Sequence, residues 1–296
     1  MPELPDIVTY LRALEPRIVG QPLEALRLAS PFVLRSVDPP VREVTGKRVL
    51  TLSRIGKRIV MELEEDLFVV VHLMVSGRFQ WKKRGDKVPG KVGLGAFDFP
   101  TGSLIFTEAS TKKRASIHLV RGRAALATFS RGGVEPLEVD LPTFTEALQR
   151  ERHTLKRALT DPRLFSGIGN AYSDEILHAA KLSPVTRTDR LDAAQIARLY
   201  ETTRRVLTEW TDRLSKEAEH EFPTKVTAFR PEMAVHGKFD QPCPVCGTKV
   251  QRIVYAENES NYCPRCQTGG KLLADRSLSR LLKDNWPKTI EELEGR

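Results

Sequence analysis

All four cysteines of the chain lie near its C-terminal end, in two Cys-x2-Cys pairs. They are Cys243, Cys246, Cys263 and Cys266, and residues 247–262 separate the two pairs. Four thiolates with this spacing suit the tetrahedral coordination that Zn²⁺ prefers, and a site closed by four cysteines is structural rather than catalytic. Two disulfides or a redox pair are the alternative, which a reducing intracellular compartment disfavours. The spacing therefore predicts one structural zinc ion.

The segment between the two cysteine pairs has the pattern of a β-hairpin. Residues 249–255 alternate as a strand does, and residues 260–262 can form its partner. Each cysteine pair forms a tight turn, and Gly247 can take the positive φ that such a turn favours. We therefore expect the zinc ion to hold a C-terminal hairpin.

Length and charge limit the class of protein further. The chain has 296 residues, enough for two domains, and 47 Lys and Arg against 38 Asp and Glu give a net charge of +9. This surplus suggests a polyanionic partner, either nucleic acid or an acidic membrane surface. With 40% hydrophobic and 29% charged residues, the chain is too apolar for a disordered tail and too polar for a membrane protein. Residues 1–6 do not resemble a signal peptide, so we expect a soluble intracellular protein.

The N-terminal half is predicted to be rich in β-strands. One helix comes first, over residues 7–14, with Asp6 as its cap. Short apolar runs then alternate with Gly, Pro, Asp and Lys, which indicates a sandwich or barrel. The runs are residues 49–52, 58–63, 68–73, 77–81, 95–99 and 103–107.

The pattern changes after residues 132–137, and from Thr143 on the periodicity is helical. We expect helices over residues 143–151, 154–160 and 171–180, and a long fourth helix capped by Asp192.

The loop before the third helix contains two glycines, which allow backbone N–H groups to approach a ligand. Asn170, at the start of that helix, can cap it or donate to an oxygen. Phosphate binding and a plain structural turn both remain open.

Several segments, in the same order along the chain, resemble the Fpg/Nei family (formamidopyrimidine-DNA glycosylase and endonuclease VIII). They are Met-Pro-Glu-Leu-Pro-Asp at residues 1–6, residues 72–78, residues 167–172 with 175–177, residues 235–237, and the zinc hairpin. The resemblance implies an α+β fold with an N-terminal β-sandwich preceded by a short helix, a helix–two-turn–helix domain and a C-terminal zinc-finger hairpin. On this basis we place domains at residues 1–130, 131–236 and 237–270, followed by a C-terminal extension at 271–296 with leucines at helical spacing, namely Leu272, Leu273, Leu278, Leu281 and Leu282.

The resemblance also implies a chemistry for the first residues, because this family removes oxidised bases from DNA and cleaves the abasic strand that results. Once Met1 is removed, Pro2 carries a secondary amine that can attack a sugar carbon, and an N-terminal amine has a pKa near 8. Glu3 resembles the family's acid/base carboxylate, and Lys57 a lysine that contacts phosphate and assists catalysis. The alternatives are an ordinary second residue for Pro2 and a solvated strand-end lysine for Lys57.

The resemblance implies roles for four further positions. Asn170 resembles an asparagine that grips phosphate, and Glu175 an active-site carboxylate. The family's loop that fills the gap left by the flipped base corresponds to residues 108–116, which include Arg114 but no Pro and no Phe. His72 matches a family motif, and we interpret it as a structural hydrogen-bonding residue.

Other positions depart from the family. The family inserts a methionine into the DNA as a wedge, and here that position is Val75, with Met74 one residue earlier. The family also has an arginine at the tip of the zinc finger, and here that position is Asn258, between Glu257 and Glu259. Arg252 is a candidate substitute for that Arg. Because extruding a base costs a few kcal/mol, a weaker wedge and a missing Arg predict slow action on intact duplex or a preference for lesions that are already unstacked, single-stranded or bulky.

Three functions remain open. The first is a bifunctional DNA glycosylase and abasic-site lyase acting on damaged, oxidised bases. The second is a protein of the same fold that binds abasic sites or damaged DNA with little or no glycosylase activity, and the third is an unrelated zinc-ribbon regulator. The expected partner is DNA with damaged bases or abasic sites, and no membrane. We expect a monomer in the bacterial cytoplasm, associated with the nucleoid.

Overall fold

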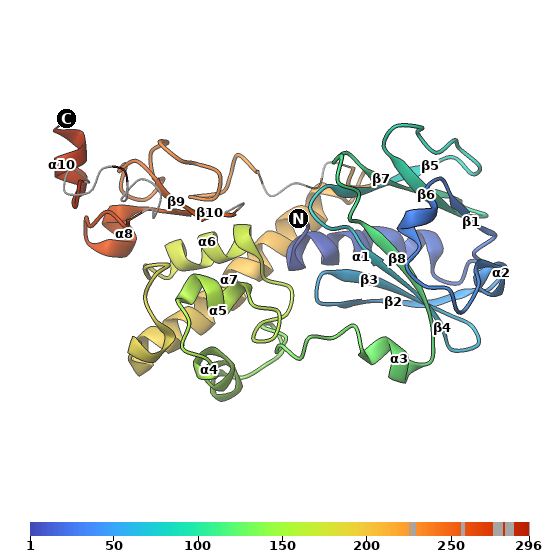
Figure 1. The fold of residues 1–296 in the computed structure, drawn as a ribbon, viewed down its shortest axis with the longest axis horizontal. Helices are drawn as coiled ribbons and strands as arrows, with labels where there is room; N and C mark the ends of the chain where they lie inside the picture. The colour runs from blue at the N-terminus through green and yellow to red at the C-terminus, as the bar shows by residue number, and fades with distance from the viewer. Residues whose placement is uncertain (225, 227–228, 256–257, 275–280, 282–286, 296) are drawn as a thin grey trace. The chain divides into compact units, whose positions relative to one another are not determined.

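The computed structural model describes residues 1–296 except 225, 227–228, 256–257, 275–280, 282–286 and 296 (Figure 1). It divides into two compact units. The β unit comprises Met1–Arg131 and Glu209–Thr227, and the helical unit comprises Gly132–Thr208 and Ala228–Arg296. The boundaries at residues 130, 236 and 270 remain predictions of where separately folding domains end.

The β unit is built from two four-stranded antiparallel sheets. One has the order β1 (Ala25–Leu28), β6 (Gly93–Phe99), β7 (Gly102–Glu108), β5 (Gly77–Lys82), and the other the order β2 (Val49–Ile55), β3 (Arg58–Leu63), β4 (Leu67–His72), β8 (Ser116–Arg121). Alternate residues of β4, such as Val69 and Val71, enter the same hydrophobic core as Phe97 and Phe106 of the other sheet. The predicted sandwich is confirmed, and strands β1 and β8 are additions to it.

Helix α1 (Leu4–Ile18) packs one face into this core, with Ile7, Tyr10 and Leu14 fully buried. Its start differs from the prediction. Glu3 is the N-cap residue, and Asp6 lies inside the first turn, where its carboxylate accepts a 2.9 Å hydrogen bond from the Glu3 N–H. The helix can begin earlier than predicted because a proline in the first turn removes only an N–H that has no partner in the helix.

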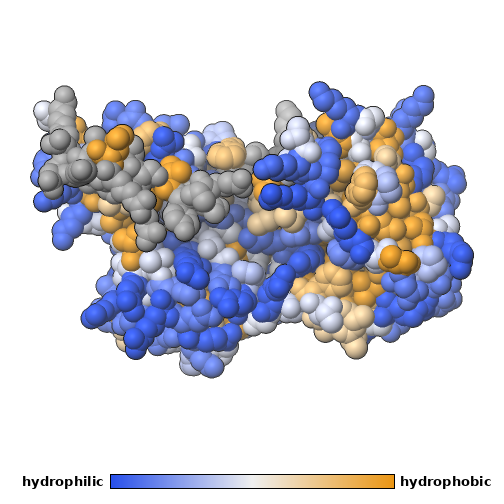
Figure 2. All heavy atoms as spheres, viewed as in Figure 1, coloured by the Kyte–Doolittle hydropathy of each residue, from blue (hydrophilic) through white to orange (hydrophobic). Residues whose placement is uncertain are grey.

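The helical unit contains α4 (Leu141–Gln149), α5 (Leu155–Thr160) and α6 (Asn170–Ala179). The long helix α7 (Ala193–Glu217) starts in this unit and ends in the β unit's second segment. The four helices confirm the predicted ones. Asp192 caps α7 by accepting a 2.7 Å hydrogen bond from the Gln195 N–H. Figure 2 shows mostly hydrophilic residues over α4 and α5, as expected for helices that bury their apolar faces.

The zinc hairpin consists of β9 (Gln251–Tyr255) and β10 (Asn258–Tyr262), followed by α8 (Pro264–Thr268). Short helical turns complete the described chain: η1 (Pro31–Val33), α2 (Val41–Val44), α3 (Arg123–Ala127), η2 (Thr188–Arg190) and α10 (Ile290–Glu294).

The C-terminal extension folds back onto the finger. The Leu272 N–H donates to the Lys288 carbonyl at 2.9 Å, and the Ile290 N–H to the Gly270 carbonyl at 3.0 Å. Leu272 and Leu273 do not lie in a helix, against the leucine pattern. Leu281 is helical and exposed, while Leu278 and Leu282 lie outside the described residues. Within the described residues, no helix is long and apolar enough to cross a bilayer.

Candidate functional site

The N-terminal residues are held in the interior of the β unit. Pro2 is buried, and Glu3 is 2% exposed. Burial lowers the pKa of the terminal amine of Met1 below its usual value. Glu3 and Asp6 oppose this change, while the positive charges of Arg78 and Lys57 add to it. An amine in this place has a larger neutral, nucleophilic fraction at physiological pH than an exposed one.

Lys57 lies in the two-residue turn between β2 and β3. Ile55 pairs with Arg58 across the turn, and Gly56 takes a φ of 59°, which a side chain would oppose. The turn holds Lys57 half-buried and close enough to the N-terminus to affect its titration. The sequence placed Lys57 at a strand end, and the structure brings its charge near the terminal amine of Met1.

His72 pairs with Arg58 across strands β4 and β3. Burial lowers the pKa of His72 to about 4, with the charges of Arg58 and Lys57 adding to the effect. The ring is therefore neutral at physiological pH. The interpretation of His72 as a structural hydrogen-bonding residue remains a prediction.

The turn after β4 presents a hydrophobic side chain to solvent. Met74 has a φ of 53°, and Val75 is 62% exposed. Gly77 closes the turn by donating a 2.8 Å hydrogen bond to the Leu73 carbonyl. A Cβ atom at Gly77 would lie 2.1 Å from that carbonyl oxygen, so only glycine fits. The turn thus displays Val75 outward, as a wedge position requires.

Glu108, at the end of β7, fixes the loop that carries Arg114. Its carboxylate is 1% exposed and accepts hydrogen bonds from the backbone N–H groups of Arg114 at 3.0 Å and Ala115 at 3.2 Å. The side chain of Arg114 is exposed. Sequence reasoning missed the role of Glu108, because a single carboxylate at a strand end carries no local signal of a capped loop.

The glycine-rich loop and the zinc hairpin meet at Asn170. Gly169, not Asn170, is the N-cap residue of α6, and Gly167 has a φ of 79°. The Asn170 side-chain amide donates a 2.7 Å hydrogen bond to the backbone carbonyl of Glu259. Of the two roles that the sequence left open, the structure shows donation to an oxygen.

Two adjacent carboxylates on α6 bind the segment that leads into the finger. Glu175 is 6% exposed and accepts three backbone hydrogen bonds, from Ala234 at 2.8 Å and from Val235 and His236 at 2.9 Å each. Burial raises the pKa of Glu175, and these three bonds oppose that change. The carboxylate, predicted to act in an active site, is thus engaged in holding this loop.

Asp174, which the sequence analysis did not single out, is the second of these carboxylates. It accepts hydrogen bonds from Lys156 at 2.5 Å, Ser260 at 2.9 Å and the His236 ring at 2.8 Å. The sequence carried no local signal for this role, because the partners of Asp174 lie at residues 156, 236 and 260.

Arg252 projects from β9 onto an aromatic ring. Its guanidinium lies 4.2 Å from the ring centroid of Phe239 and 3.2 Å from a carboxylate oxygen of Glu259. Asn258 begins strand β10, but its side chain and residues 256–257 lie outside the described residues.

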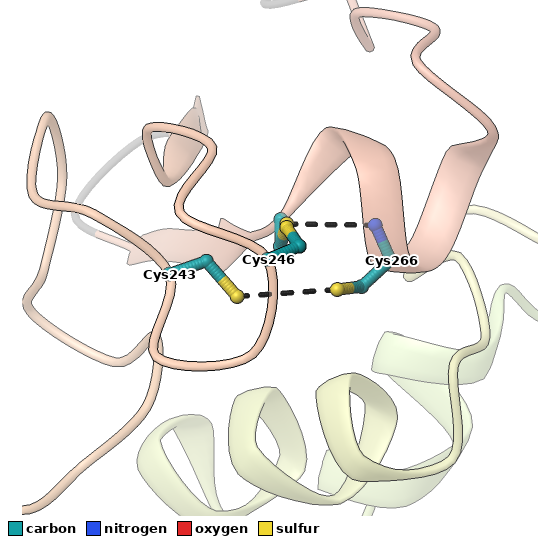
Figure 3. A group of neighbouring side chains, drawn as sticks. Cys243, Cys246 and Cys266 are labelled. Carbon is teal, nitrogen blue, oxygen red and sulfur yellow. Dashed lines mark hydrogen bonds between the residues drawn. The ribbon is translucent and has the colours of Figure 1, made fainter.

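The four cysteine sulfurs lie within 4.8 Å of one another. The Sγ atoms of Cys243 and Cys266 are 3.9 Å apart and point toward each other (Figure 3), and those of Cys246 and Cys263 are 3.4 Å apart. Zn–S bonds of about 2.3 Å place sulfurs about 3.8 Å apart in a tetrahedron, whereas a disulfide needs about 2.05 Å. The arrangement fits a zinc ion and contains no disulfide.

A second group of candidate ligands, Glu151, His153 and Asp161, does not suit a metal. Arg163 lies 3.3 Å from Glu151 and 2.6 Å from Asp161, so a cation already balances both carboxylates.

Three family models match the chain. The N-terminal domain of formamidopyrimidine-DNA glycosylase matches residues 1–119, its H2TH domain residues 133–216, and the zinc finger found in FPG and IleRS residues 240–269. The finger match and the four-sulfur cluster together assign one structural zinc ion to the chain.

Curated relatives match over nearly their whole length. The formamidopyrimidine-DNA glycosylase of Thermus thermophilus is 31% identical over 277 residues, 91% of this chain and 100% of the relative. That of Heliobacterium modesticaldum is 30% identical over 276 residues, 90% of this chain and 100% of the relative. An uncharacterized formamidopyrimidine-DNA glycosylase-like protein of Mycobacterium tuberculosis is 40% identical over 151 residues, 51% of this chain and 94% of the relative.

Solved structures agree with the sequence matches. Lactococcus lactis Fpg in complex with DNA containing an abasic site is 27% identical, with a TM-score of 0.78 over 90% of this chain and 99% of that one. The same enzyme with DNA containing an oxidised pyrimidine gives 28% identity and 0.79, over 90% and 100%. The Thermus thermophilus Fpg structure gives 31% and 0.76, over 90% and 98%. The chain belongs to the formamidopyrimidine-DNA glycosylase family.

Proposed function

We propose that this chain is a base-excision DNA glycosylase that removes damaged, oxidised bases and then cleaves the abasic strand. The observation that carries the proposal is the buried N-terminus, where Pro2 lies next to Glu3, the N-cap residue of α1, and where burial and the charges of Arg78 and Lys57 lower the pKa of the Met1 amine. The Lactococcus lactis relative, solved with abasic DNA and with oxidised-pyrimidine DNA, supports it.

The first step is base release. After Met1 is removed, the lone pair of the Pro2 nitrogen attacks C1′ of the damaged nucleotide, and the base leaves with the glycosidic electron pair and takes up a proton. The nitrogen passes its own proton to the Glu3 carboxylate, and the ring C1′–O4′ bond then breaks. Glu3 gives a proton to O4′, which leaves an iminium ion between Pro2 and C1′.

The second step is strand cleavage. The iminium makes the C2′ proton acidic, and loss of that proton expels the 3′ phosphate by β-elimination. A further elimination releases the 5′ phosphate, and water hydrolyses the iminium to free Pro2. Lys57, half-buried near the terminus, is suited to hold the phosphate next to the lesion.

DNA binding draws on both units. Asn170 and the zinc hairpin with Arg252 and Asn258 supply phosphate contacts from the helical unit. Glu175 acts by holding the 234–236 backbone. In the β unit, the exposed Val75 beside Met74 and the exposed Arg114 occupy the wedge and gap-filling positions.

The second candidate is a damaged-DNA or abasic-site binding protein with weak or no glycosylase activity. The short Val75 side chain and the ion pair between Arg252 and Glu259 favour it, because both weaken extrusion of a base from intact duplex. Where base release does occur, we expect faster action on lesions that are already unstacked or single-stranded.

Borohydride trapping tests the chemistry. The chain is prepared with a cleavable N-terminal tag, before and after cleavage that leaves Pro2 first, and is mixed with DNA containing an abasic site. A covalent adduct only after cleavage supports the Pro2 mechanism. If no adduct forms with the free terminus, the lyase assignment fails. An adduct on abasic DNA without release of any oxidised base from a lesion panel would favour the second candidate.

We further propose that the protein acts as a monomer in the bacterial cytoplasm and associates with the nucleoid through the net charge of +9. Light scattering of the purified chain and imaging of a C-terminal fluorescent fusion test these two points.

A further inference from the structure

An aromatic side chain is exposed on the segment that leads into the zinc finger. Phe229 is 71% exposed, and its ring stacks on that of His236, with centroids 5.6 Å apart and an interplanar angle of 24°. His236, by contrast, is only 6% exposed. The exposed ring therefore rests on a buried one.

Gly237 fixes the position of the exposed ring. It has a φ of 71°, and a Cβ atom at this position would lie 2.8 Å from Cδ1 of Phe229. The backbone of Gly237 thus lies against the Phe229 ring, and any larger residue would displace it. The ring is confined by His236 and by Gly237 together.

The support beneath the ring is polar and buried. The His236 Nδ1 atom lies 2.8 Å from Asp174, whose side chain is fully buried and is also bound by Lys156 and Ser260. The three hydrogen bonds to Glu175 hold the backbone from Ala234 to His236. Two buried carboxylates are thus engaged in orienting one histidine and its loop.

We propose that Phe229 is a stacking surface for an unpaired nucleobase of the DNA. The inference rests on the proposed function and adds a ligand class to it, because the ligand is the base itself rather than the phosphate backbone. Scattered exposed hydrophobic side chains are common and need no explanation. Phe229 differs from them in lying on a ring that hydrogen bonds hold in place, and aromatic rings held in this way bind unpaired bases by stacking.

The test compares single-stranded DNA with fully paired duplex of the same sequence. We expect Phe229→Ala to weaken binding about tenfold more for the single strand than for the duplex, since stacking requires an unpaired base. Phe229→Trp should restore the difference, and Phe229→Leu, which is apolar but has no ring, should not. Phe32→Ala is the matched control, because Phe32 is 74% exposed in the β unit and has no assigned role.

A direct readout is the fluorescence of 2-aminopurine in a single-stranded oligonucleotide. We expect the wild-type chain and Phe229→Trp to quench it, and Phe229→Ala to quench it markedly less at saturating protein. His236→Ala should behave as Phe229→Ala does if the histidine positions the ring. Zinc content and thermal unfolding of each variant establish that the fold is intact.

Three results would overturn the inference: equal losses of affinity on single-stranded and fully paired DNA, quenching unchanged in Phe229→Ala, or wild-type binding and quenching by Phe229→Leu. Each of these can be obtained while the chain still forms the Pro2 adduct. Quenching can also be measured without catalysis, so failure of the inference is distinguishable from failure of the proposed function.

Discussion

The Asn170 side-chain amide lies 2.7 Å from the main-chain carbonyl of Glu259 and donates a hydrogen bond to it. This bond joins the glycine-rich loop before α6 to strand β10 of the finger. An amide nitrogen has two N–H groups, so one remains to contact a phosphate while the other holds the hairpin.

Replacing Asn170 should therefore affect both the hairpin and the DNA. In Asn170→Asp, an acceptor faces the Glu259 carbonyl and a negative charge faces the phosphates, so we expect DNA affinity to fall about 100-fold. Asn170→Ala removes the donor without adding charge and should lose about tenfold. Fluorescence anisotropy with abasic DNA measures both, and equal affinity of Asn170→Asp and the wild type would refute a phosphate-facing role.

The Arg252–Glu259 ion pair should limit how strongly the finger binds phosphate. In Glu259→Gln, Arg252 loses its 3.2 Å carboxylate partner and keeps its place over Phe239, while the backbone carbonyl that binds Asn170 is retained. We expect tighter DNA binding and a salt dependence steeper by about one released counterion. Arg252→Gln should produce the opposite change.

Asp240→Asn is the control for this prediction, because it releases Lys249 from a 2.8 Å ion pair in the same finger and changes the net charge equally. An effect of Glu259→Gln no larger than that of Asp240→Asn would mean that general charge, and not Arg252, determines the affinity.

Loss of zinc should separate binding from chemistry. Cys243 is 2% exposed, and its sulfur lies 3.3 Å from Nε2 of His178 on α6. Cys243→Ser removes one of four ligands, so we expect the zinc content to fall from one ion per chain to near zero and DNA affinity to drop by at least tenfold. The terminal amine belongs to the β unit, and the borohydride adduct should still form at DNA concentrations high enough to offset weak binding. A zinc content that stays at one per chain would contradict the four-cysteine site.

Stability of the β unit should fall in mild acid because of His72. Its pKa is about 4 in the folded chain against about 6.5 for an ordinary histidine, so between these values the unfolded state binds more protons. Stability then decreases as pH falls through this window, by about 2 kcal/mol between pH 7.5 and pH 5.

His72→Gln should remove this part of the pH dependence, whereas substitution of the exposed His220 should not. Urea unfolding of the three proteins across the pH range provides the measurement. Parallel stability curves for the wild type and His72→Gln would show that His72 titrates normally.

The elements that the sequence revealed are those with a strong local signal. The apolar run that became β4 is continuous, and the caps at Thr154 and Asp192 accept hydrogen bonds from the residues three positions later. The zinc ligands could also be predicted from the sequence, because four cysteines at this spacing are typical of a structural zinc site. Strand β1 was missed because it is only four residues long and is fixed by pairing with β6 rather than by its own pattern.

The parts of the site that the sequence did not reveal depend on distant contacts. Nothing in residues 171–178 indicates that Asp174 meets His236 or that Glu175 caps a loop, because these partners are about 60 positions away. The exposure of Phe229 and the partners of Arg252 are likewise properties of the folded chain. The sequence was enough to name candidate residues for binding phosphate or a base. It was not enough to predict which of these residues contact one another in the folded chain.

The finger segment matched by the family model covers residues 240–269, yet several of the hydrogen bonds that hold it are made with residues outside that range. Ser260 reaches Asp174, Gln267 donates to the Leu182 carbonyl at 2.9 Å, and the Glu259 carbonyl receives Asn170. If this segment were grafted onto another protein, it would still bind the metal. It would lose its orientation, because the α6 residues that hydrogen-bond to it would be missing. In this chain the finger segment alone contains the residues that bind the metal. To be oriented for DNA binding, it also requires α6.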